Sequence, residues 1–427
     1  MKQKCSFFLS IVGALVWLFL SIWLAVPWIA HLDEKLPLVY VLLVVFGIAL
    51  LPGYLMCAMF LSNLMNRKLM PLTGAGTEQA VTVVICARNE ERIIYRTIRA
   101  IAEQEYPGPI EILCVDNGST DRTRAEILRA AEQLQSQTRR IRLLECAQPG
   151  KAYALNTALE EVKTRFFLTV DADTLLEKTA VAAIVERITV SGAACVAGNL
   201  LAAQPATWVQ KMQIYDYLIS IAAVKRYQGS YQSTLVAQGA FSAYDTHAVK
   251  RAGGWVQSAG EDIVLTYQLL AQGRASVYEP QAVGYTFTPG TLGALCRQRT
   301  RWAKGMIEGL RAVRPWGQPA ASSGYFEALN LSIFFLDWAY VFGFLVGVVL
   351  ALLGMPWFVG WLTLLTLPAL LISSASVYRF QSKIPAVRIQ NSFCGFICFV
   401  LFFQAIQSVC SLTGYLAALT KHALAWK

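Results

Sequence analysis

The sequence predicts an α/β protein: a doubly wound, mostly parallel sheet flanked by transmembrane helices, two before it and about three after it. The chain has 427 residues, of which 56% are hydrophobic and only 15% charged. Its long apolar stretches gather at the two ends, and between them short β-rich runs alternate with amphipathic segments. We expect membrane helices in residues 1–68, a soluble domain in 69–290, interfacial amphipathic helices in 291–330 and C-terminal membrane helices in 331–427.

The two N-terminal apolar stretches, 7–30 and 36–64, each reach the ~20 residues that a helix needs to cross a bilayer. Lys2 and Lys4 precede the first stretch, as in a signal peptide. The stretch is nevertheless longer than the apolar core of such a peptide, roughly 7 to 15 residues, and a second one follows. We therefore expect both helices to be retained. Because basic residues flank the pair at both outer ends, the positive-inside rule places the N-terminus and the central domain in the cytoplasm.

The central domain shows the alternation of a parallel sheet. Residues 90–103 and 121–134 carry apolar residues at helical spacing, and they separate short runs that have the composition of buried strands. The predicted strands are 81–87, 110–115, 141–144, 166–170 and 194–197.

Polar residues follow these predicted strands at their carboxyl ends, where open α/β sheets bind their ligands. Arg88 and Glu90 follow the first strand, Asp116 ends the second, and Asp171 and Asp173 follow the fourth. This coincidence predicts a ligand-binding crevice at one edge of the sheet.

Asp171 and Asp173 are close enough to share a hard divalent cation, Mg²⁺ or Mn²⁺, which prefers oxygen ligands. A solvated pair of loop acids is the alternative when the motif is taken alone. Its position after a buried strand, together with the other motifs, favours the metal.

Asp116 begins the segment Asp-Asn-Gly-Ser-Thr-Asp, whose composition is typical of a turn and a helix cap. At a strand end, however, its carboxylate can also accept a hydrogen bond from a uracil or ribose group. Lys151 lies in a segment that lacks the full P-loop pattern and is not an ATP site. It could still contact a nucleotide, or be an ordinary surface lysine.

Asp262 lies in Gly260-Glu261-Asp262, just before the periodic apolar run 263–270. It is either a helix cap, favoured by the helix dipole, or a general base that takes the proton of an attacking hydroxyl. A single displacement of that kind inverts the anomeric centre of a sugar.

Gln298, Arg301 and Trp302 share one face of a predicted helix. Arg301 has the planar fork that suits a diphosphate, and Trp302 offers a stacking surface to a sugar. Segment 238–242, with Gly239 and Phe241, is a candidate second wall of the same site.

A plainer interpretation of this helix is an amphipathic element at the membrane surface, with Arg297, Arg299 and Lys304 on lipid phosphates.

The C-terminal third contains three further apolar stretches, 331–354, 357–378 and 393–418. Asp337 lies in the first of them, either on a substrate pathway or at the membrane interface. A single proline- and glycine-rich segment, 315–319, should end the helix that precedes these stretches.

Net charge and cysteine content bear on which ligands the protein binds and on whether it contains a cysteine metal site or disulfides. The net charge of +10 suits membrane lipid and a nucleotide diphosphate, and no nucleic-acid recognition motif occurs. The ten cysteines form no metal-ligand pattern, and a cytoplasmic domain is not expected to contain disulfides.

Taken together, Asp116, the Asp171–Asp173 pair, Gly260-Glu261-Asp262 and Gln298-x-x-Arg301-Trp302 resemble the membrane-embedded processive family-2 glycosyltransferases. The resemblance covers about residues 81–305, and the compact layout looks closest to the bacterial poly-N-acetylglucosamine synthases. Cellulose, chitin and hyaluronan synthases share the pattern.

The resemblance implies a glycosyltransferase A-type fold and residue roles. Asp116 and Lys151 would hold the uridine, and Arg88, Glu90, Asp171, Gln298 and Arg301 would also belong to the donor site. Asp171 and Asp173 would hold the metal, and Asp262 would be the catalytic base. Trp302, Glu261 and Phe241 would contact the acceptor.

The function implied is an inverting synthase that transfers sugar, with N-acetylglucosamine as the first choice, from a UDP-sugar to a growing β-linked polysaccharide and exports the product. Its expected location is the bacterial inner membrane, as a multi-pass protein in contact with lipid and with room for a small membrane partner subunit. Nucleic acid is not an expected partner. Two departures qualify the match: many family members have Thr-Glu-Asp where this chain has Gly260-Glu261-Asp262, and we expect no C-terminal cyclic-dinucleotide domain.

Two other functions remain open from the sequence. A transferase that acts once on a membrane lipid would use the same donor site. A non-enzymatic export or receptor component on a degenerate fold would more naturally have lost one of the acids, and none is missing.

Overall fold

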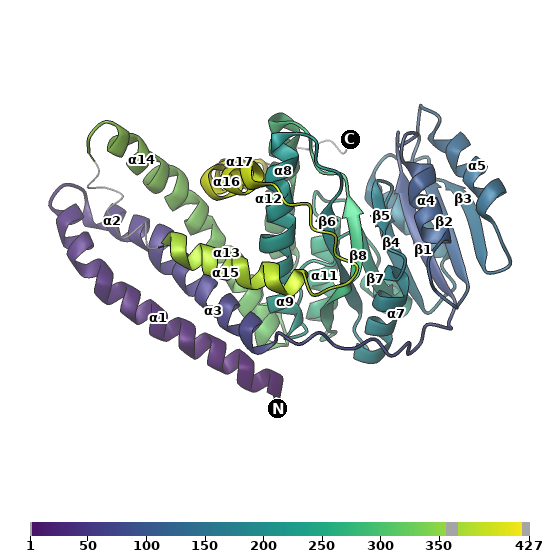
Figure 1. Ribbon diagram of the computed structural model, residues 1–427, viewed down its shortest axis with the longest axis horizontal. Helices are drawn as coiled ribbons and strands as arrows, with labels where there is room; N and C mark the ends of the chain where they lie inside the picture. The colour runs from purple at the N-terminus through teal and green to yellow at the C-terminus, as the bar shows by residue number, and fades with distance from the viewer. Residues whose placement is uncertain (1, 356–365, 421–427) are drawn as a thin grey trace.

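The computed structural model describes residues 2–355 and 366–420 (Figure 1). Its helices are α1 (Lys2–Asp33), α2 (Leu38–Val45), α3 (Leu51–Met65), α4 (Ile94–Ala102), α5 (Thr123–Leu134), α6 (Lys151–Glu161), α7 (Ala180–Ser191), α8 (Trp208–Tyr215), α9 (Ala222–Gly229), α10 (Thr246–Ala252), α11 (Glu261–Ala271), α12 (Leu292–Ala312), α13 (Ala321–Ala339), α14 (Leu345–Leu352), α15 (Thr366–Gln381), α16 (Phe393–Cys398) and α17 (Gln404–Leu419). Its strands are β1 (Val81–Ala87), β2 (Ile110–Asp116), β3 (Arg139–Glu145), β4 (Phe166–Asp171), β5 (Thr174–Leu176), β6 (Cys195–Ala202), β7 (Phe241–Asp245) and β8 (Ser276–Thr286).

The described strands form one sheet in the order β3-β2-β1-β4-β7-β6-β8-β5. From β3 to β4 all pairings are parallel, as the sequence predicts. Beyond β4 the sheet is mixed, because β7 runs antiparallel to both β4 and β6, and β5 runs antiparallel to β8. The sheet is therefore parallel on one side and mixed on the other, as expected for a glycosyltransferase A-type fold.

Helices cover both faces of the sheet, and each face has its own core. Alternate residues of β1 show the division, since Val83 and Ile85 belong to one core and Val84 and Cys86 to the other. The first core includes α4, α5 and α7, and the second includes α6, α10 and α11. Burial on both faces explains why the central strands β1, β2 and β4 are nearly continuous apolar runs.

Three of the observed strands were not predicted. Each of them lacks a continuous apolar run of the kind that indicates a buried strand. β5 has only three residues, β7 ends in Asp245, and β8 contains Glu279 and Gln281. β6 was predicted as 194–197 but extends to Ala202. Pairing with neighbouring strands, rather than local composition, creates these elements.

The membrane side has four helical segments long and apolar enough to span a bilayer: Cys5–Asp33, Leu38–Met65, Ala321–Leu352 and Phe393–Leu419. Their apolar side chains face outward, as in Trp23, which is 70% exposed, and Phe393, which is 80% exposed. Outward-facing apolar surfaces of this size are typical of helices that lie in a membrane. A short π-helical segment joins α2 to α3, and similar segments join α13 to α14 and α16 to α17.

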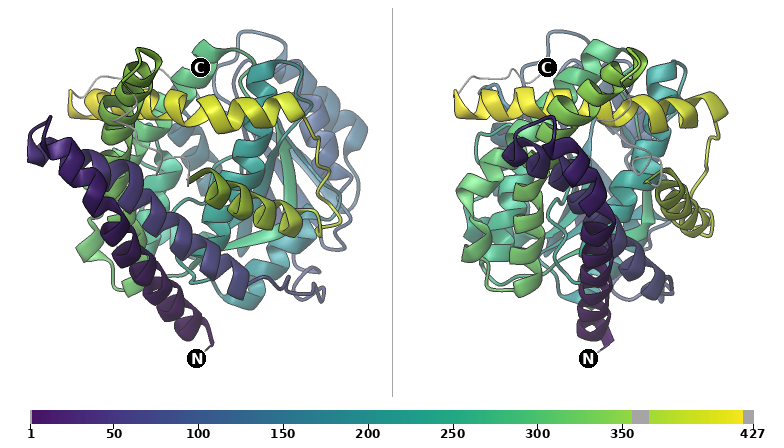
Figure 2. Two further views of the ribbon diagram at one scale, coloured as in Figure 1. Left: turned by 60° about the vertical axis from the view of Figure 1, so that its left-hand side comes forward. Right: turned by 90° about the vertical axis from the view of Figure 1, so that its left-hand side faces the viewer.

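The C-terminal segments are arranged differently from a simple bundle. α1 packs along α3, whereas α17 packs along α12 of the central domain. In the right-hand view of Figure 2 the α16–α17 segment (yellow) runs at a steep angle to α1 (purple). The predicted span 357–378 begins outside the described residues, and its described part is α15. As predicted, α12 ends before the proline- and glycine-rich segment, which forms a short 3₁₀ turn at Pro315–Gly317.

Candidate active site

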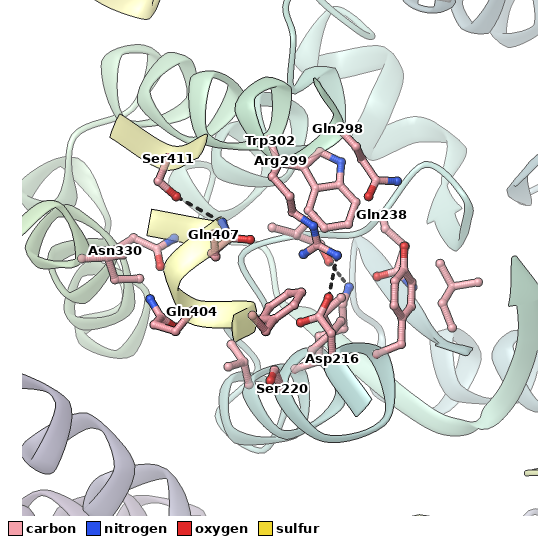
Figure 3. A pocket seen from close by; sticks show the side chains of 18 of the residues that line it. Asp216, Ser220, Gln238, Gln298, Arg299, Trp302, Asn330, Gln404, Gln407 and Ser411 are labelled. Atoms are coloured by element: carbon pink, nitrogen blue, oxygen red, sulfur yellow. Dashed lines mark hydrogen bonds and ion pairs between the residues drawn. The ribbon is translucent and has the colours of Figure 1, made fainter. Parts of the chain in front are cut away.

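A cavity of about 2410 Å³ connects the strand ends to the membrane helices. Its walls come from the ends of β1 and β4, the segment before β7, the start of α11, α12 and, at the far end, α3, α13 and α17. Figure 3 shows its central part, where side chains of α12 meet those of α17. One continuous space therefore joins the predicted ligand-binding edge of the sheet to the apolar helices.

Most residues that the sequence singled out line this cavity, although they come from separate elements. They are Arg88, Glu90, Lys151, Asp171, Asp173, Glu261, Asp262, Gln298, Arg301 and Trp302.

Lys151 lies among the acids at the centre of the cavity. Its Nζ is 2.6 Å from Oδ1 of Asp171 and 3.7 Å from Oε1 of Glu261. Burial lowers the pKa of Lys151, but the two carboxylates outweigh this effect and raise it above the usual value. Burial also raises the pKa of Glu261 above its usual range, with Lys151 opposing the change. The Lys151 ammonium is directed to the acids, and its contact with uridine stays a prediction.

The carboxylates of Asp171 and Asp173 have the chemistry that a hard divalent cation requires. Within the described part of the chain, no group of three or more acids, histidines or cysteines is close enough to hold a metal alone. The Lys151 ammonium lies against the Asp171 carboxylate, in the position where a metal cation would neutralise this acid. The pair therefore fits a metal that completes its coordination with water and ligand oxygens, as Mg²⁺ commonly does.

Asp262 is held at the cavity wall by two backbone amides. Its Oδ2 accepts from Gly239 N at 3.1 Å, and its Oδ1 accepts from Ile263 N at 2.9 Å. Gly260, not Asp262, is the N-cap of α11, so the acid lies in the first turn. The two N–H groups and the first turn of α11 hold this carboxylate at the cavity wall.

Two glycines bring the start of α11 against α12. A Cβ placed on Gly305 would lie 2.6 Å from the Cα of Gly260, and one placed on Gly260 would lie 2.7 Å from the Cα of Gly305. Real Cβ atoms do not approach backbone so closely, so the contact requires glycine on both sides. This contact fixes Asp262 relative to Arg301 and Trp302.

Two predicted site residues do not line the cavity. Phe241 is fully buried in the core of the sheet and contacts the backbone at Gly198. Its predicted contact with an acceptor is therefore wrong, because side chains alternate along β7 and this one points inward. Gly239 and Ala240 form the wall instead. Asp116 is buried at the end of β2, where its carboxylate accepts from Ser119 N at 3.1 Å.

The proposed lipid contacts of α12 are also corrected. Arg299 and Lys304 are buried rather than exposed, and Arg299 pairs with Asp216. Only Arg297 of the three is exposed. α12 packs between α11 and α17, so most of its surface is covered by protein.

Asp337 lies in the middle of the segment Ala321–Leu352, not near its end. Its carboxylate accepts from the hydroxyls of Ser408 at 2.8 Å and Tyr415 at 2.7 Å, both on α17. The acid therefore ties α13 to α17 beside the cavity.

Two charged residues that the sequence motifs do not include, Lys225 and Asp216, also line the cavity. Both lie in the largely apolar segment 208–229, where a charged residue is itself a signal. Lys225 Nζ donates to Val236 O at 2.9 Å. Burial lowers the pKa of Lys225 to about 7, and Asp262 and Cys195 oppose this shift.

Replacing Lys225 by methionine should change how stability depends on pH. Between about pH 7 and the usual lysine pKa of about 10.4, the unfolded chain binds a proton that the folded chain does not. Stability of the wild type therefore rises with pH in this window. We expect the Tm of Lys225→Met, relative to wild type, to fall as the pH is raised from 7 to 9.

The control is Lys250→Met, which removes a bond of the same kind, from Nζ to Val162 O at 3.1 Å, on an exposed lysine. Thermal unfolding of both variants in detergent would be compared with wild type at each pH. A relative Tm for Lys225→Met that stays constant from pH 7 to 9 would contradict the expectation.

Comparison with known proteins gives one family. Residues 78–305 match the model described as "Glycosyltransferase like family 2". A poly-beta-1,6-N-acetyl-D-glucosamine synthase of Staphylococcus epidermidis is 28% identical over 242 residues, 56% of this chain and 58% of that protein. A synthase of the same name from Staphylococcus aureus (strain COL) is 28% identical over 229 residues, 53% of this chain and 54% of that protein. The chain thus spans little more than half the length of these relatives.

Among solved structures, the fold is similar to that of a mannosyltransferase of Pyrobaculum calidifontis in complex with GDP-Man and Mn²⁺. The TM-score is 0.60 at 18% identity, and the match covers 89% of this chain and 100% of the other.

Proposed function

The chain belongs to the glycosyltransferase-like family 2, and on that premise we propose that it is an inverting polysaccharide synthase. It transfers a sugar, N-acetylglucosamine as the first choice, from a UDP-sugar to a growing β-linked polymer and passes the product across the membrane. The choice of N-acetylglucosamine rests on the similarity to the two staphylococcal synthases.

One observation carries this proposal: the acids at the strand ends and the polar side chains of the membrane helices line the same cavity. At the membrane end the walls carry amides and hydroxyls of α13 and α17, among them Asn330, Gln404, Gln407 and Ser411 (Figure 3). These groups can hydrogen-bond sugar hydroxyls inside otherwise apolar helices. A transferase that releases a soluble product has no need of such a path.

The donor side of the proposed site uses Asp171, Asp173 and Arg301. A divalent cation held by the two acids would neutralise the diphosphate as it leaves. Arg301 contributes a planar guanidinium that can pair with the same phosphates. Lys151, freed from Asp171 by the cation, would remain beside Glu261 and the donor.

The acceptor side uses Asp262 as the general base. Its carboxylate takes the proton of the acceptor hydroxyl while that oxygen bonds to the anomeric carbon. The bond from this carbon to the diphosphate breaks in the same displacement, UDP leaves, and the configuration inverts. Trp302 would stack against the acceptor sugar.

Basic residues set the proposed orientation. Lys2 and Lys4 before the first span and Arg67 and Lys68 after the second support a cytoplasmic central domain, on the side where nucleotide sugars are found. A multi-pass location in the bacterial inner membrane follows from the proposed export.

The test is turnover by purified protein in lipid with Mg²⁺ or Mn²⁺. UDP-N-acetylglucosamine, UDP-glucose and UDP-glucuronate would be supplied separately and in pairs, with UDP release and product size recorded. Long product from UDP-N-acetylglucosamine alone supports the proposal. A single sugar added to lipid would instead identify a lipid glycosyltransferase, and no turnover with any donor would contradict the enzyme as proposed.

Substituting Gly305 by alanine tests the contact that aligns the site. The new Cβ would overlap the Cα of Gly260, so α11 and α12 must separate by a few tenths of an ångström or more. We expect kcat to fall at least tenfold, because small misplacements in an active site are costly, and the Tm to fall as well. Gly293→Ala is the matched control on α12, since its nearest neighbour would be 3.6 Å away at a flexible arginine. Wild-type kcat in Gly305→Ala would contradict the alignment role.

A further inference from the structure

The wall of the cavity contains a buried ion pair that the mechanism above does not use. Arg299 Nη2 donates to Asp216 Oδ2 at 2.6 Å, and the residues are 4% and 3% exposed (Figure 3). Asp216 follows α8, and Arg299 lies on α12, so the pair connects two separate elements of the central domain. Burial raises the pKa of Asp216, and the adjacent guanidinium opposes that rise.

Stability alone is a poor explanation for this pair. Removing two charges from water costs free energy that their attraction only partly returns, and an apolar pair of similar size is often at least as stable. The Nε of Arg299 is also buried without a hydrogen-bond partner in the structure. Buried ionic groups of this kind are best understood by what they hold in place.

Arg299 holds an aromatic ring. Its guanidinium carbon lies 4.3 Å from the centre of the Trp302 ring and 5.2 Å from that of Phe403. Both distances allow cation–π attraction. Phe403 belongs to the π-helical segment that precedes α17. The arginine therefore sits where the central domain, the proposed acceptor residue and a membrane helix meet.

The Asp216 carboxylate determines where this cation lies. Asp216 is the acid that forms an ion pair with Arg299 in the described part of the chain. Without this carboxylate, the plane of the Arg299 guanidinium would not be fixed against the indole of Trp302. With it, a fixed cation lies over one face of Trp302, and the partly buried ring lines the cavity.

We propose that the Asp216–Arg299 pair is a positioning device that fixes the Trp302 ring, and thereby sets whether an acceptor sugar or water takes the donor sugar. This inference rests on the proposed function. When the ring is in place, the acceptor hydroxyl lies against Asp262 and bonds to the anomeric carbon. When the ring is loose, a water molecule can occupy that position. Its oxygen loses a proton to Asp262 and bonds to the anomeric carbon while the bond from this carbon to the diphosphate breaks, which yields UDP and free sugar.

The experiment measures two products of the same reaction. UDP released and sugar incorporated into polymer are counted for wild type, Asp216→Asn and Arg299→Lys, together with product length and the donor KM. We expect incorporated sugar per UDP to fall at least threefold and the product to shorten, with donor KM changed less than twofold. A merely structural role would lower both counts in parallel.

A double-mutant cycle then asks whether the pair acts through the ring. Asp216→Asn and Trp302→Phe should have effects on product length that are clearly less than additive. Fully additive effects, or an unchanged ratio of sugar to UDP in Asp216→Asn, would overturn the proposal. Asp216→Asn could fail to fold because it leaves Arg299 unpaired. In that case the double variant Asp216→Asn/Arg299→Gln removes both charges, and the same ratio of incorporated sugar to released UDP is measured for it.

The matched control is Glu279→Gln, which neutralises another buried acid near an arginine. Glu279 lies 3.8 Å from Arg187 and does not line the active-site cavity. Its sugar-to-UDP ratio should equal that of wild type. An inactive wild type would count against the proposed function, whereas an active wild type with variants of unchanged ratio would count against the positioning role alone.

Discussion

Asp262→Asn should lower kcat for sugar transfer by roughly 10²- to 10⁴-fold, the usual contribution of a positioned general base. Asparagine has nearly the same shape and retains one oxygen that can accept from Gly239 N or Ile263 N, the two amides that hold the carboxylate. What it loses is the ability to take a proton. Binding of the donor should therefore change little while chemistry stops.

The measurements are the initial rate of UDP release and the affinity for UDP by calorimetry. The control is Asp245→Asn, because Asp245 also accepts from a backbone amide at a helix start, that of Ala248 at 2.9 Å, but outside the cavity. It should lose some thermal stability as a weakened cap and keep its kcat. Retention of more than a tenth of wild-type kcat in Asp262→Asn would rule out its role as base.

Removal of divalent cation should abolish transfer, and Asp173→Asn should weaken it at least roughly 100-fold. A cation at the diphosphate supplies several kcal/mol of charge stabilisation, and each 1.36 kcal/mol is a factor of ten in rate. The effect of chelation should reverse when Mn²⁺ or Mg²⁺ is added back. In Asp173→Asn, higher metal concentrations should restore part of the rate.

A readout independent of turnover is the binding of Mn²⁺, followed by electron paramagnetic resonance with and without UDP. Asp171→Asn and Asp173→Asn should both weaken it, whereas Glu186→Gln should not, since that acid binds the backbone at Thr73 and Gly74 away from the cavity. Full activity in the presence of excess chelator would contradict the metal site and leave Lys151 as the cation at Asp171.

Much of the fold of the central domain could be predicted, because strands and helices of this kind show in the pattern of neighbouring residues. Three of the first four predicted strands, β1, β2 and β4, contain nearly unbroken apolar runs, and the helices between the strands repeat apolar residues at helical spacing. The cavity-lining acids were found for the same reason: a parallel strand delivers its last residues to one edge, so Asp171 and Asp173 could be placed without knowing the neighbours.

Other features had no local signal. Phe241 is apolar and sits beside a glycine in the proposed wall, yet the pairing of β7 between β4 and β6 turns it into the core. Arg299 has the sequence character of a surface residue on an amphipathic helix. Only the approach of Asp216, 83 positions away in the chain, makes it a buried ion pair.

The sequence by itself determined the kind of protein: apolar helices at both ends, a two-sided sheet between them, and acids at the strand ends with the composition of a metal and base site. These follow from periodicity and composition, which act within a few residues. Only the tertiary structure decided which groups meet. The contact of Lys151 with Asp171, the Gly260–Gly305 crossing and the Asp216–Arg299 ion pair depend on the packing of distant elements, because side chains interact through space at a few ångströms.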